Sequence, residues 1–135
     1  MRRSDFPAKL ENLQKMQAFI RQEAEQCGFA AGELNKIQLA GEEALVNVIN
    51  YAYPGKEGGL EISCLARNGG MEIEISDSGI SFNPLNLPEP DINMPLEQRK
   101  IGGLGIYMIR KLMDQVTYSR DGEYNKLKMF LSLRL

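Results

Sequence analysis

The spacing of apolar positions predicts two helices in the first half of the chain. Apolar residues follow helical spacing from Ala8 to Cys27, and Gly28 is a natural stop. A longer helix is predicted over Lys36–Tyr53, ending at the turn Tyr53-Pro54-Gly55, with an apolar stripe made of Ile37, Ala44, Leu45, Val48 and Ala52. Before both helices, residues 3–7 are expected to form a short edge strand, with Pro7 suited to the start of the first helix.

A period of two residues, typical of strands, governs most of the remaining pattern. Residues 60–67 and 71–76 alternate in this way around Asn68-Gly69-Gly70, which is a hairpin sequence. Val116 and Tyr118 begin a further strand, Asp121-Gly122 turns it, and the apolar residues of 127–133 alternate in the last strand. Four strands and an edge strand therefore accompany the helices.

Between the two hairpins the pattern is lost. Residues 83–101 contain four prolines and no clear periodicity, so this segment is expected to be a mobile lid that orders over a bound ligand. A third helix is predicted to open at Gly102-Gly103-Leu104-Gly105. The order of elements predicts one domain over residues 1–135 with an α+β fold. This is a two-layer α/β sandwich, in which helices cover one face of a mixed, mostly antiparallel sheet.

Composition excludes several classes of chemistry. The chain has no histidine, so Ser-His-Asp or Cys-His catalysis, His-ligated zinc and phosphohistidine formation on this chain are excluded. A net charge of −2 argues against direct nucleic-acid binding, and no apolar run approaches the ~20 residues of a membrane span. Cys27 and Cys64 lack metal-ligand spacing and no signal peptide follows Met1, so a reduced, cytoplasmic setting is expected.

Candidate chemistry begins on one flank of the long helix, where Glu43, Asn47 and Asn50 fall together. Glu43 and Asn47 are four residues apart, which places a carboxylate and a carboxamide on adjacent turns. A proton acceptor beside a neutral oxygen ligand suits a site for a hard cation such as Mg²⁺. The alternative is that these polar residues simply face water.

Two further motifs suggest a ligand. The alternation of residues 71–75 places Asp77 on the apolar face of its strand, where it would need a donor such as the amine of adenine. The alternative is a turn-forming Asp outside the core. Gly102-Gly103-Leu104-Gly105 at a helix start would let the backbone approach an anion, with Lys100 just before it, although such a cluster is often only a flexible loop.

Glu43-x-x-x-Asn47, Asp77-x-Gly79 and Gly103-Leu104-Gly105, in this order, resemble the N, G1 and G2 boxes of the GHKL (Bergerat-fold) ATP-binding superfamily. The stretches GEEALVNVINYAYPG, ISDSGISFNP and GGLGIYMIRKLMDQVTYSR are similar to the anti-sigma-factor serine/threonine-protein kinases of bacteria. The resemblance covers nearly the whole chain. It implies the α/β sandwich of that superfamily, with ATP and Mg²⁺ as ligands.

The resemblance also implies roles for individual residues. Glu43 matches the catalytic base, Asn47 the Mg²⁺ ligand, and Asp77 the acceptor of the adenine amine. The remaining nucleotide-binding positions are Asn50, Gly79, Lys100, Gly102, Gly103, Leu104 and Gly105. The chain departs from the family pattern in three places: at Tyr51, at Asn83 and at the dipeptide Lys100-Ile101. The last of these leaves open which cation contacts the phosphates.

The activity implied is a kinase that phosphorylates a serine or threonine of a small antagonist protein and also sequesters a sigma factor. A homodimer is left open. One alternative is a module that binds ATP as a regulatory switch without transferring phosphate. Another is the ATPase domain of a histidine kinase, against which the absence of histidine and of a phosphoacceptor helix pair argues.

Overall fold

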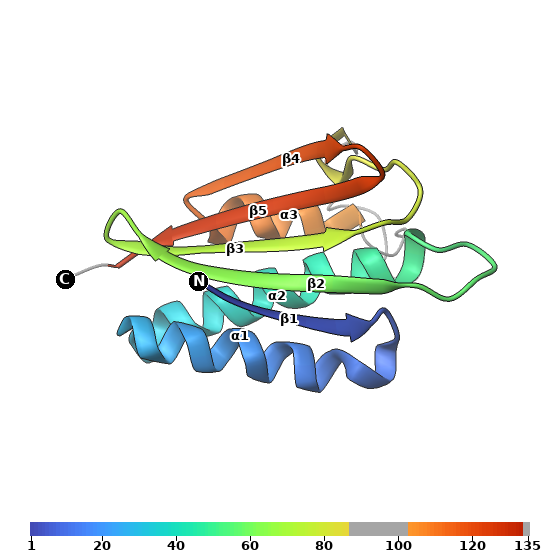
Figure 1. Cartoon of the computed structure of the whole chain (residues 1–135). Helices are drawn as coiled ribbons and strands as arrows, with labels where there is room; N and C mark the ends of the chain where they lie inside the picture. Colours follow the sequence, from blue (N-terminus) through green and yellow to red (C-terminus); the bar gives the residue numbers. More distant parts are fainter. Residues whose placement is uncertain (87–102, 134–135) are drawn as a thin grey trace.

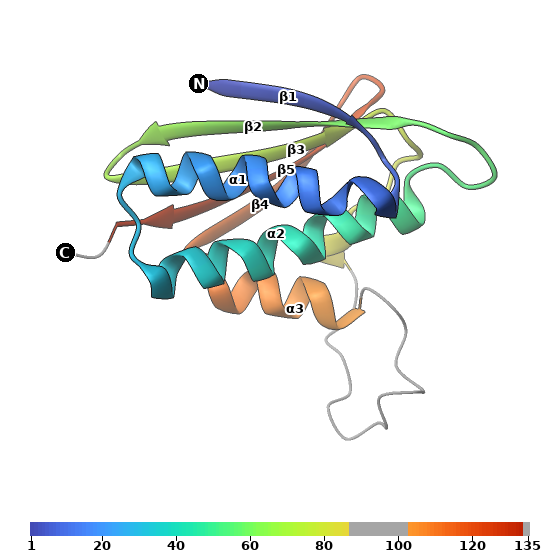
Figure 2. The same ribbon diagram turned by 90° about the horizontal axis from the view of Figure 1, so that it is seen from below.

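A layer of helices lies on one face of a five-stranded sheet in the computed structural model of the chain, which describes residues 1–86 and 103–133 (Figures 1 and 2). The elements are β1 (Arg2–Pro7), the 3-10 turn η1 (Leu10–Asn12), α1 (Leu13–Cys27), α2 (Ala31–Tyr51), β2 (Gly59–Arg67), β3 (Gly70–Asp77), the 3-10 turn η2 (Pro84–Asn86), α3 (Gly103–Leu112), β4 (Gln115–Asp121) and β5 (Tyr124–Ser132). None of the helices described is both long and apolar enough to cross a membrane.

The strands lie in the order β1-β2-β3-β5-β4, and each neighbouring pair is antiparallel. The α+β prediction is confirmed, while the parallel component of the expected mixed sheet is not found among the described strands. Both hairpins, β2-β3 and β4-β5, are joined by short turns. In the first, Asn68 and Gly69 have φ of 50° and 73°, the left-handed pair that an Asn-Gly hairpin turn requires.

The N-terminal segment differs from the expectation in one respect. Pro7 is the last residue of β1 and pairs with Gly59, so it does not start a helix. An edge strand tolerates a proline because one row of its N–H groups has no partner strand. The helix begins only at Leu13, after η1, and Leu10 is therefore exposed, whereas Met16 and Ile20 are fully buried.

The long helix begins earlier than predicted, at Ala31 rather than Lys36. Ala30 is extended and its carbonyl oxygen accepts the first helical bond, from the Leu34 N–H at 2.9 Å. The predicted apolar stripe is confirmed, because Ile37, Ala44, Leu45 and Ala52 are buried and Val48 is half-buried. This stripe packs with the core side chains of β2, β3 and β5, and α3 packs beside α2.

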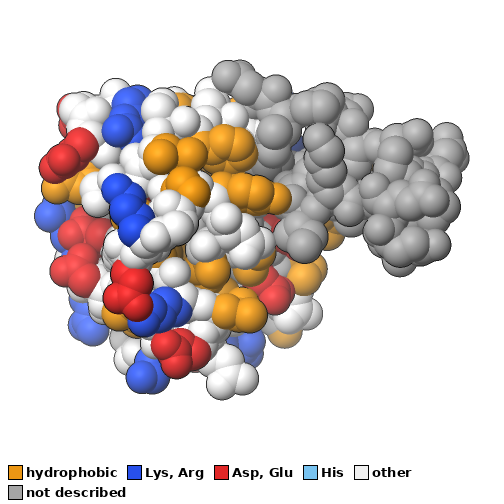
Figure 3. All heavy atoms as spheres, turned by 90° about the vertical axis from the view of Figure 1, so that its right-hand side faces the viewer, with side chains coloured by type: hydrophobic (Ala, Val, Ile, Leu, Met, Phe, Trp, Pro, Cys, Tyr) orange, Lys and Arg blue, Asp and Glu red, His pale blue; other side chains and the backbone are white. Residues whose placement is uncertain are grey.

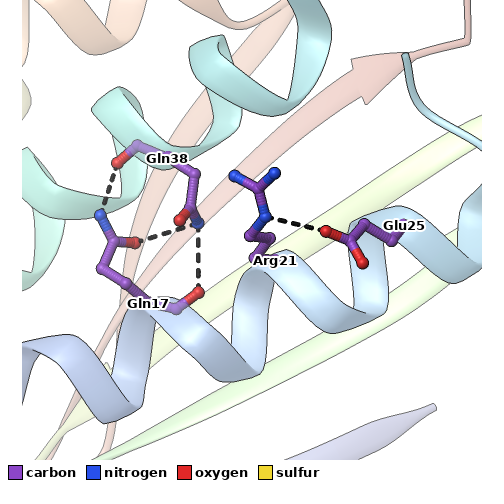
Figure 4. A network of polar contacts seen from close by, with 4 residues as sticks. All are labelled: Gln17, Arg21, Glu25 and Gln38. Carbon is purple, nitrogen blue, oxygen red and sulfur yellow. Dashed lines mark hydrogen bonds and ion pairs between the residues drawn. The ribbon is translucent and has the colours of Figure 1, made fainter. Parts of the chain in front are cut away.

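Two glutamines hold α1 and α2 together (Figure 4). Gln17 Nε2 donates to the Gln38 carbonyl oxygen at 2.7 Å, and Gln38 Nε2 donates to the Gln17 carbonyl oxygen at 3.1 Å. Gly41 lies beside them, where a Cβ would come 3.1 Å from Gln17 Oε1. These reciprocal bonds fix α2 against α1 and so help to set where the C-terminal half of α2 meets the sheet.

Candidate functional site

A small cavity lies between the C-terminal half of α2 and the sheet, at the end where β3 terminates. The residues that form its wall are Ala44, Asn47 and Val48 of α2, Ala52 just after α2, Ile75 and Asp77 of β3, Ile80 and Phe82 of the following loop, Pro84 of η2, Tyr118 of β4, and Asn125 and Leu127 of β5. Viewed from this end, hydrophobic side chains gather on the surface of the molecule (Figure 3). The cavity has a volume of about 30 Å³. Among mostly apolar walls, it contains a carboxylate and two carboxamides.

Asp77 lies on the core side of β3, as the alternation predicts, and only 6% of it is exposed. Its Oδ1 accepts two hydrogen bonds, from the Gly79 N–H and from Asn125 Nδ2, both at 2.9 Å. The bond from the Gly79 N–H is the contact that a turn-forming aspartate makes, which is the alternative interpretation of the sequence. Asp77 therefore ends the strand and is also buried in the core. Neither bond uses Oδ2, which is the oxygen that remains for a donor in the cavity.

Asn47 is buried on α2, and both its Oδ1 and its Nδ2 lie buried without a hydrogen-bond partner. A buried polar group left unsatisfied costs about 1–3 kcal/mol, so this arrangement is retained at the expense of stability. A neutral amide oxygen of this kind fits Mg²⁺, which takes few protein ligands beside water and phosphate oxygens. No group of three or more acidic or cysteine side chains within residues 1–86 and 103–133 could hold a metal ion.

Glu43 and Asn50, the other two residues of the predicted flank, do not line the cavity. Glu43 is half-buried one turn before Asn47, and Asn50 is exposed. Burial, and then the negative charge of Glu42, raise the pKa of Glu43 above its ordinary value. A carboxylate with a raised pKa is a stronger proton acceptor, which is what a catalytic base requires.

The end of β3 is pressed against the end of α2, and this contact explains Gly79. A Cβ on Gly79 would come 2.2 Å from the Ala52 carbonyl oxygen, which accepts a bond from the Ile80 N–H at 2.9 Å. Tyr53, which the sequence indicates only as a turn residue, stabilises the same contact between the ends of β3 and α2. Its hydroxyl accepts the Ser78 N–H at 3.0 Å and donates to the Gly59 carbonyl oxygen.

The glycine motif opens a helix as predicted, because α3 begins at Gly103 and its first turn contains Leu104 and Gly105. Because α3 packs beside α2, the start of α3 and the Asn47 helix belong to the same layer (Figure 2). Lys100, Gly102 and nearly all of the predicted lid lie outside the described residues. Of that lid, residues 83–86 are described, and they include the cavity residue Pro84.

Two of the departures from the family pattern have a structural role here. The Tyr51 ring packs against Phe82, a cavity residue, with ring centroids 5.6 Å apart. Asn83 Oδ1 accepts the Leu85 N–H at 2.9 Å and so caps η2, a bond that an aspartate at this position could make equally well. Neither departure removes a residue from the cavity wall.

Asn125 is the site residue that sequence reasoning missed. It pairs directly with Asp77 across β3 and β5, and it is buried. The signal was present: the alternation of Leu127, Met129 and Leu131, counted backwards, places position 125 on the core face by the same rule that placed Asp77. It was hidden because Asn125 follows a turn, where an asparagine is ordinarily a turn residue.

Known proteins match the chain along most of its length. A family model described as the histidine kinase-like ATPase domain matches residues 6–131. Proteins named serine-protein kinase RsbW, from Bacillus mycoides and Bacillus cereus, are each 32% identical to the chain over 120 residues, which is 86% of this chain and 75% of theirs.

Solved structures are similar in fold. The RsbU and RsbW domains of a Mycobacterium tuberculosis protein match 98% of the chain with a TM-score of 0.65 at 14% identity, and the chain spans 33% of that structure. The histidine kinase domain of a blue-light activated kinase from Erythrobacter litoralis matches 91% of the chain with a TM-score of 0.55 at 14% identity, and the chain spans 60% of it. These two matches concern the fold alone.

Proposed function

This chain belongs to the histidine kinase-like ATPase domain family, and from that premise we propose that it is an ATP-dependent serine/threonine-protein kinase. Its substrate is a small antagonist protein that carries the accepting hydroxyl, and its second partner is a sigma factor. The relatives named serine-protein kinase support this proposal, since they are 32% identical over 120 residues.

The observation that carries the proposal is the pairing of Asp77 with Asn47 in one cavity. Asp77 offers an acceptor oxygen, and Asn47 keeps both polar atoms buried without a partner. A purely structural core would not leave the Asn47 amide unsatisfied, because an apolar residue at this position would be more stable. The pair is suited to the two ends of a nucleotide: Asp77 to the amine of adenine and Asn47 to the metal at the phosphates.

Each of these residues has a separate role in phosphoryl transfer. Gly103 and Gly105 let the backbone N–H groups at the start of α3 face the phosphates. Asn47 would hold Mg²⁺ through its amide oxygen, and the ion would neutralise negative charge on the phosphates. The Glu43 carboxylate takes the hydroxyl proton of the accepting serine or threonine. The hydroxyl oxygen bonds to the γ-phosphorus as the bond from that phosphorus to the bridging oxygen of ADP breaks.

The cavity must widen for this role. Its volume of about 30 Å³ is room for about one water molecule and not for a purine. Of the residues that line it, Ile80 and Phe82 lie in the loop between β3 and η2, and Pro84 begins η2. Nucleotide binding is therefore expected to move Phe82 and Pro84 outwards, while the Gly79 and Ile80 carbonyl oxygens stay bonded to Arg120 and Asn125.

A binding switch without phosphotransfer is the second candidate. It is favoured by the position of Glu43, which is half-buried and does not line the cavity. The two functions are separated by recovering the partner from the source cell with this protein as bait, with and without Mg-ATP, and then adding γ-labelled ATP. Label on the partner supports the kinase. Capture that depends on ATP but leaves the partner unlabelled supports the switch, and no ATP binding at all contradicts both.

Replacing Asn47 by leucine is expected to stabilise the nucleotide-free protein while removing the Mg²⁺ dependence of ATP binding. The change replaces a buried, unsatisfied amide by an apolar side chain of similar size, which should raise the free energy of unfolding by about 1–2 kcal/mol. Urea unfolding measures the first effect, and calorimetry with ATP, with and without Mg²⁺, measures the second. Asn35→Leu, at an exposed position of the same helix, is the control. Retained Mg²⁺ dependence in Asn47→Leu would contradict the metal role.

The pH profile of phosphate transfer should reflect the environment of Glu43. Burial and Glu42 raise the pKa of Glu43, and the carboxyl is a base only when ionised. Transfer should therefore be lost as the pH falls through this raised pKa, at a higher pH than an ordinary glutamate would give. Glu42→Gln removes a negative charge, lowers the pKa of Glu43 and should move the acidic limb of kcat/KM to lower pH. If the acidic limb of the kcat/KM profile were unchanged in Glu42→Gln, Glu43 would not be the group whose ionisation controls transfer.

A further inference from the structure

Asn125 is the centre of a hydrogen-bond network that joins the β4-β5 hairpin to the end of β3. Its Nδ2 donates to Asp77 Oδ1 at 2.9 Å and to the Ile80 carbonyl oxygen at 2.7 Å. Its Oδ1 accepts from the Tyr118 hydroxyl at 2.5 Å and from Arg120 Nη1 at 3.1 Å. Both N–H groups and both lone pairs of the carboxamide are therefore used by the protein.

This saturation fixes which way the amide faces. If the carboxamide were flipped, its oxygen would face Asp77 Oδ1 and the Ile80 carbonyl oxygen, and its NH₂ would face Arg120 Nη1 and the Phe82 N–H, which can only donate. These four contacts would become repulsive, whereas the Tyr118 hydroxyl could turn and accept. Arg120 thus fixes the donor side of Asn125 towards Asp77, and the Tyr118 hydroxyl stabilises the same orientation through its bond to Oδ1.

The same network holds the loop after β3 at its base. Arg120 Nη1 also donates to the Gly79 carbonyl oxygen at 2.9 Å, beside the bond from Asn125 to Ile80. The backbone on the C-terminal side of Asp77 is therefore tied to β4 and β5. The carboxyl group of Asp77 is held on one side by Asn125 and the Gly79 N–H, and its Oδ1 is fully occupied.

We propose that Asn125, oriented by Tyr118 and Arg120, is a positioning residue that selects adenine by holding Asp77 with Oδ2 towards the ligand amine. Asn125 does not itself contact the nucleotide, because its hydrogen-bonding capacity is already used. The proposal rests on the proposed function in one respect, namely that the ligand is an adenine nucleotide. It adds the residue that makes the Asp77 carboxylate selective for a base bearing an exocyclic amine.

A cycle of protein and ligand changes tests this role. Asn125→Asp keeps the size and the acceptor for Tyr118 and Arg120, but it turns an oxygen towards Asp77 Oδ1. Binding of ATP and of purine riboside 5′-triphosphate, which lacks only the amine, is measured by calorimetry for both proteins. We expect Asn125→Asp to weaken ATP binding about tenfold or more and to change binding of the analogue by less than about threefold.

Tyr118→Phe is the second variant, and Asn35→Asp is the control. Tyr118→Phe keeps the ring that lines the cavity and removes one of the donors to Asn125 Oδ1, so a loss of about threefold is expected for ATP alone. The Tyr118→Phe variant still tests the positioning role of Asn125 if Asn125→Asp does not fold. Asn35→Asp makes the same chemical change at an exposed position and should alter neither affinity.

Equal losses for ATP and the analogue, or no loss for either, would overturn the positioning role and leave the proposed function intact. Failure of the wild-type protein to bind either triphosphate is a separate outcome. It would contradict the proposed function itself, and the positioning role with it.

Discussion

Replacing Glu43 by glutamine is expected to cut phosphate transfer to the antagonist protein about 10²-fold or more, because a general base contributes 10²–10⁴-fold in rate. Affinity for ATP should change little, since Glu43 does not line the cavity that holds Asp77 and Asn47. Glutamine keeps the size and the position on α2 but cannot accept the hydroxyl proton. Single-turnover transfer of labelled phosphate measures the rate, and calorimetry measures the affinity.

Glu42→Gln is the matched control for this experiment. Glu42 is the neighbouring acid on the same helix, is exposed, and is rotated ~100° from Glu43 about the helix axis. Its loss should shift the pH profile without removing the base. Equal transfer by the wild type and Glu43→Gln would show that Glu43 is not the base, and the switch function would then become the better account.

Asp77→Asn should weaken ATP binding about 10- to 100-fold, which corresponds to losing a hydrogen bond to a charged acceptor. The geometry gives a specific reason. Oδ1 must remain an acceptor for the Gly79 N–H and for Asn125 Nδ2, so the new amide will keep its oxygen there. Its NH₂ then takes the place of Oδ2, and a donor faces the donor amine of adenine.

The same geometry predicts a change of preference and not only a loss. Inosine triphosphate carries a carbonyl oxygen where ATP carries the amine, so it should lose less affinity than ATP in Asp77→Asn. The ratio of the two dissociation constants, measured by calorimetry, should therefore move towards inosine triphosphate. An equal fold-loss of affinity for both nucleotides would mean that Asp77 supports the fold and does not discriminate between the bases.

Much of the fold follows from local pattern. The strands of both hairpins and the helix that contains Asn47 are predicted by periodicity, because the spacing of apolar residues marks the face of each element that is buried. Errors occur at element ends. The start of α1 moves to Leu13 because Pro7 pairs with Gly59 in β1, and α2 begins at Ala31, where the Ala30 carbonyl oxygen accepts the first helical bond. The burial of Asp77 follows from the same counting.

The sequence by itself determined the order of elements, the acidic residue on the core face of β3 and the glycines at the start of α3, since these depend on neighbours in the chain. Only the tertiary structure decided that Asn47 is buried without a partner, that Asn50 faces solvent, and that Asn125 bonds to Asp77. Asp77 and Asn125 are 48 residues apart, and the register of β3 on β5 brings them together. Strand register is a long-range property, set by how whole faces pack, so no local pattern contains it.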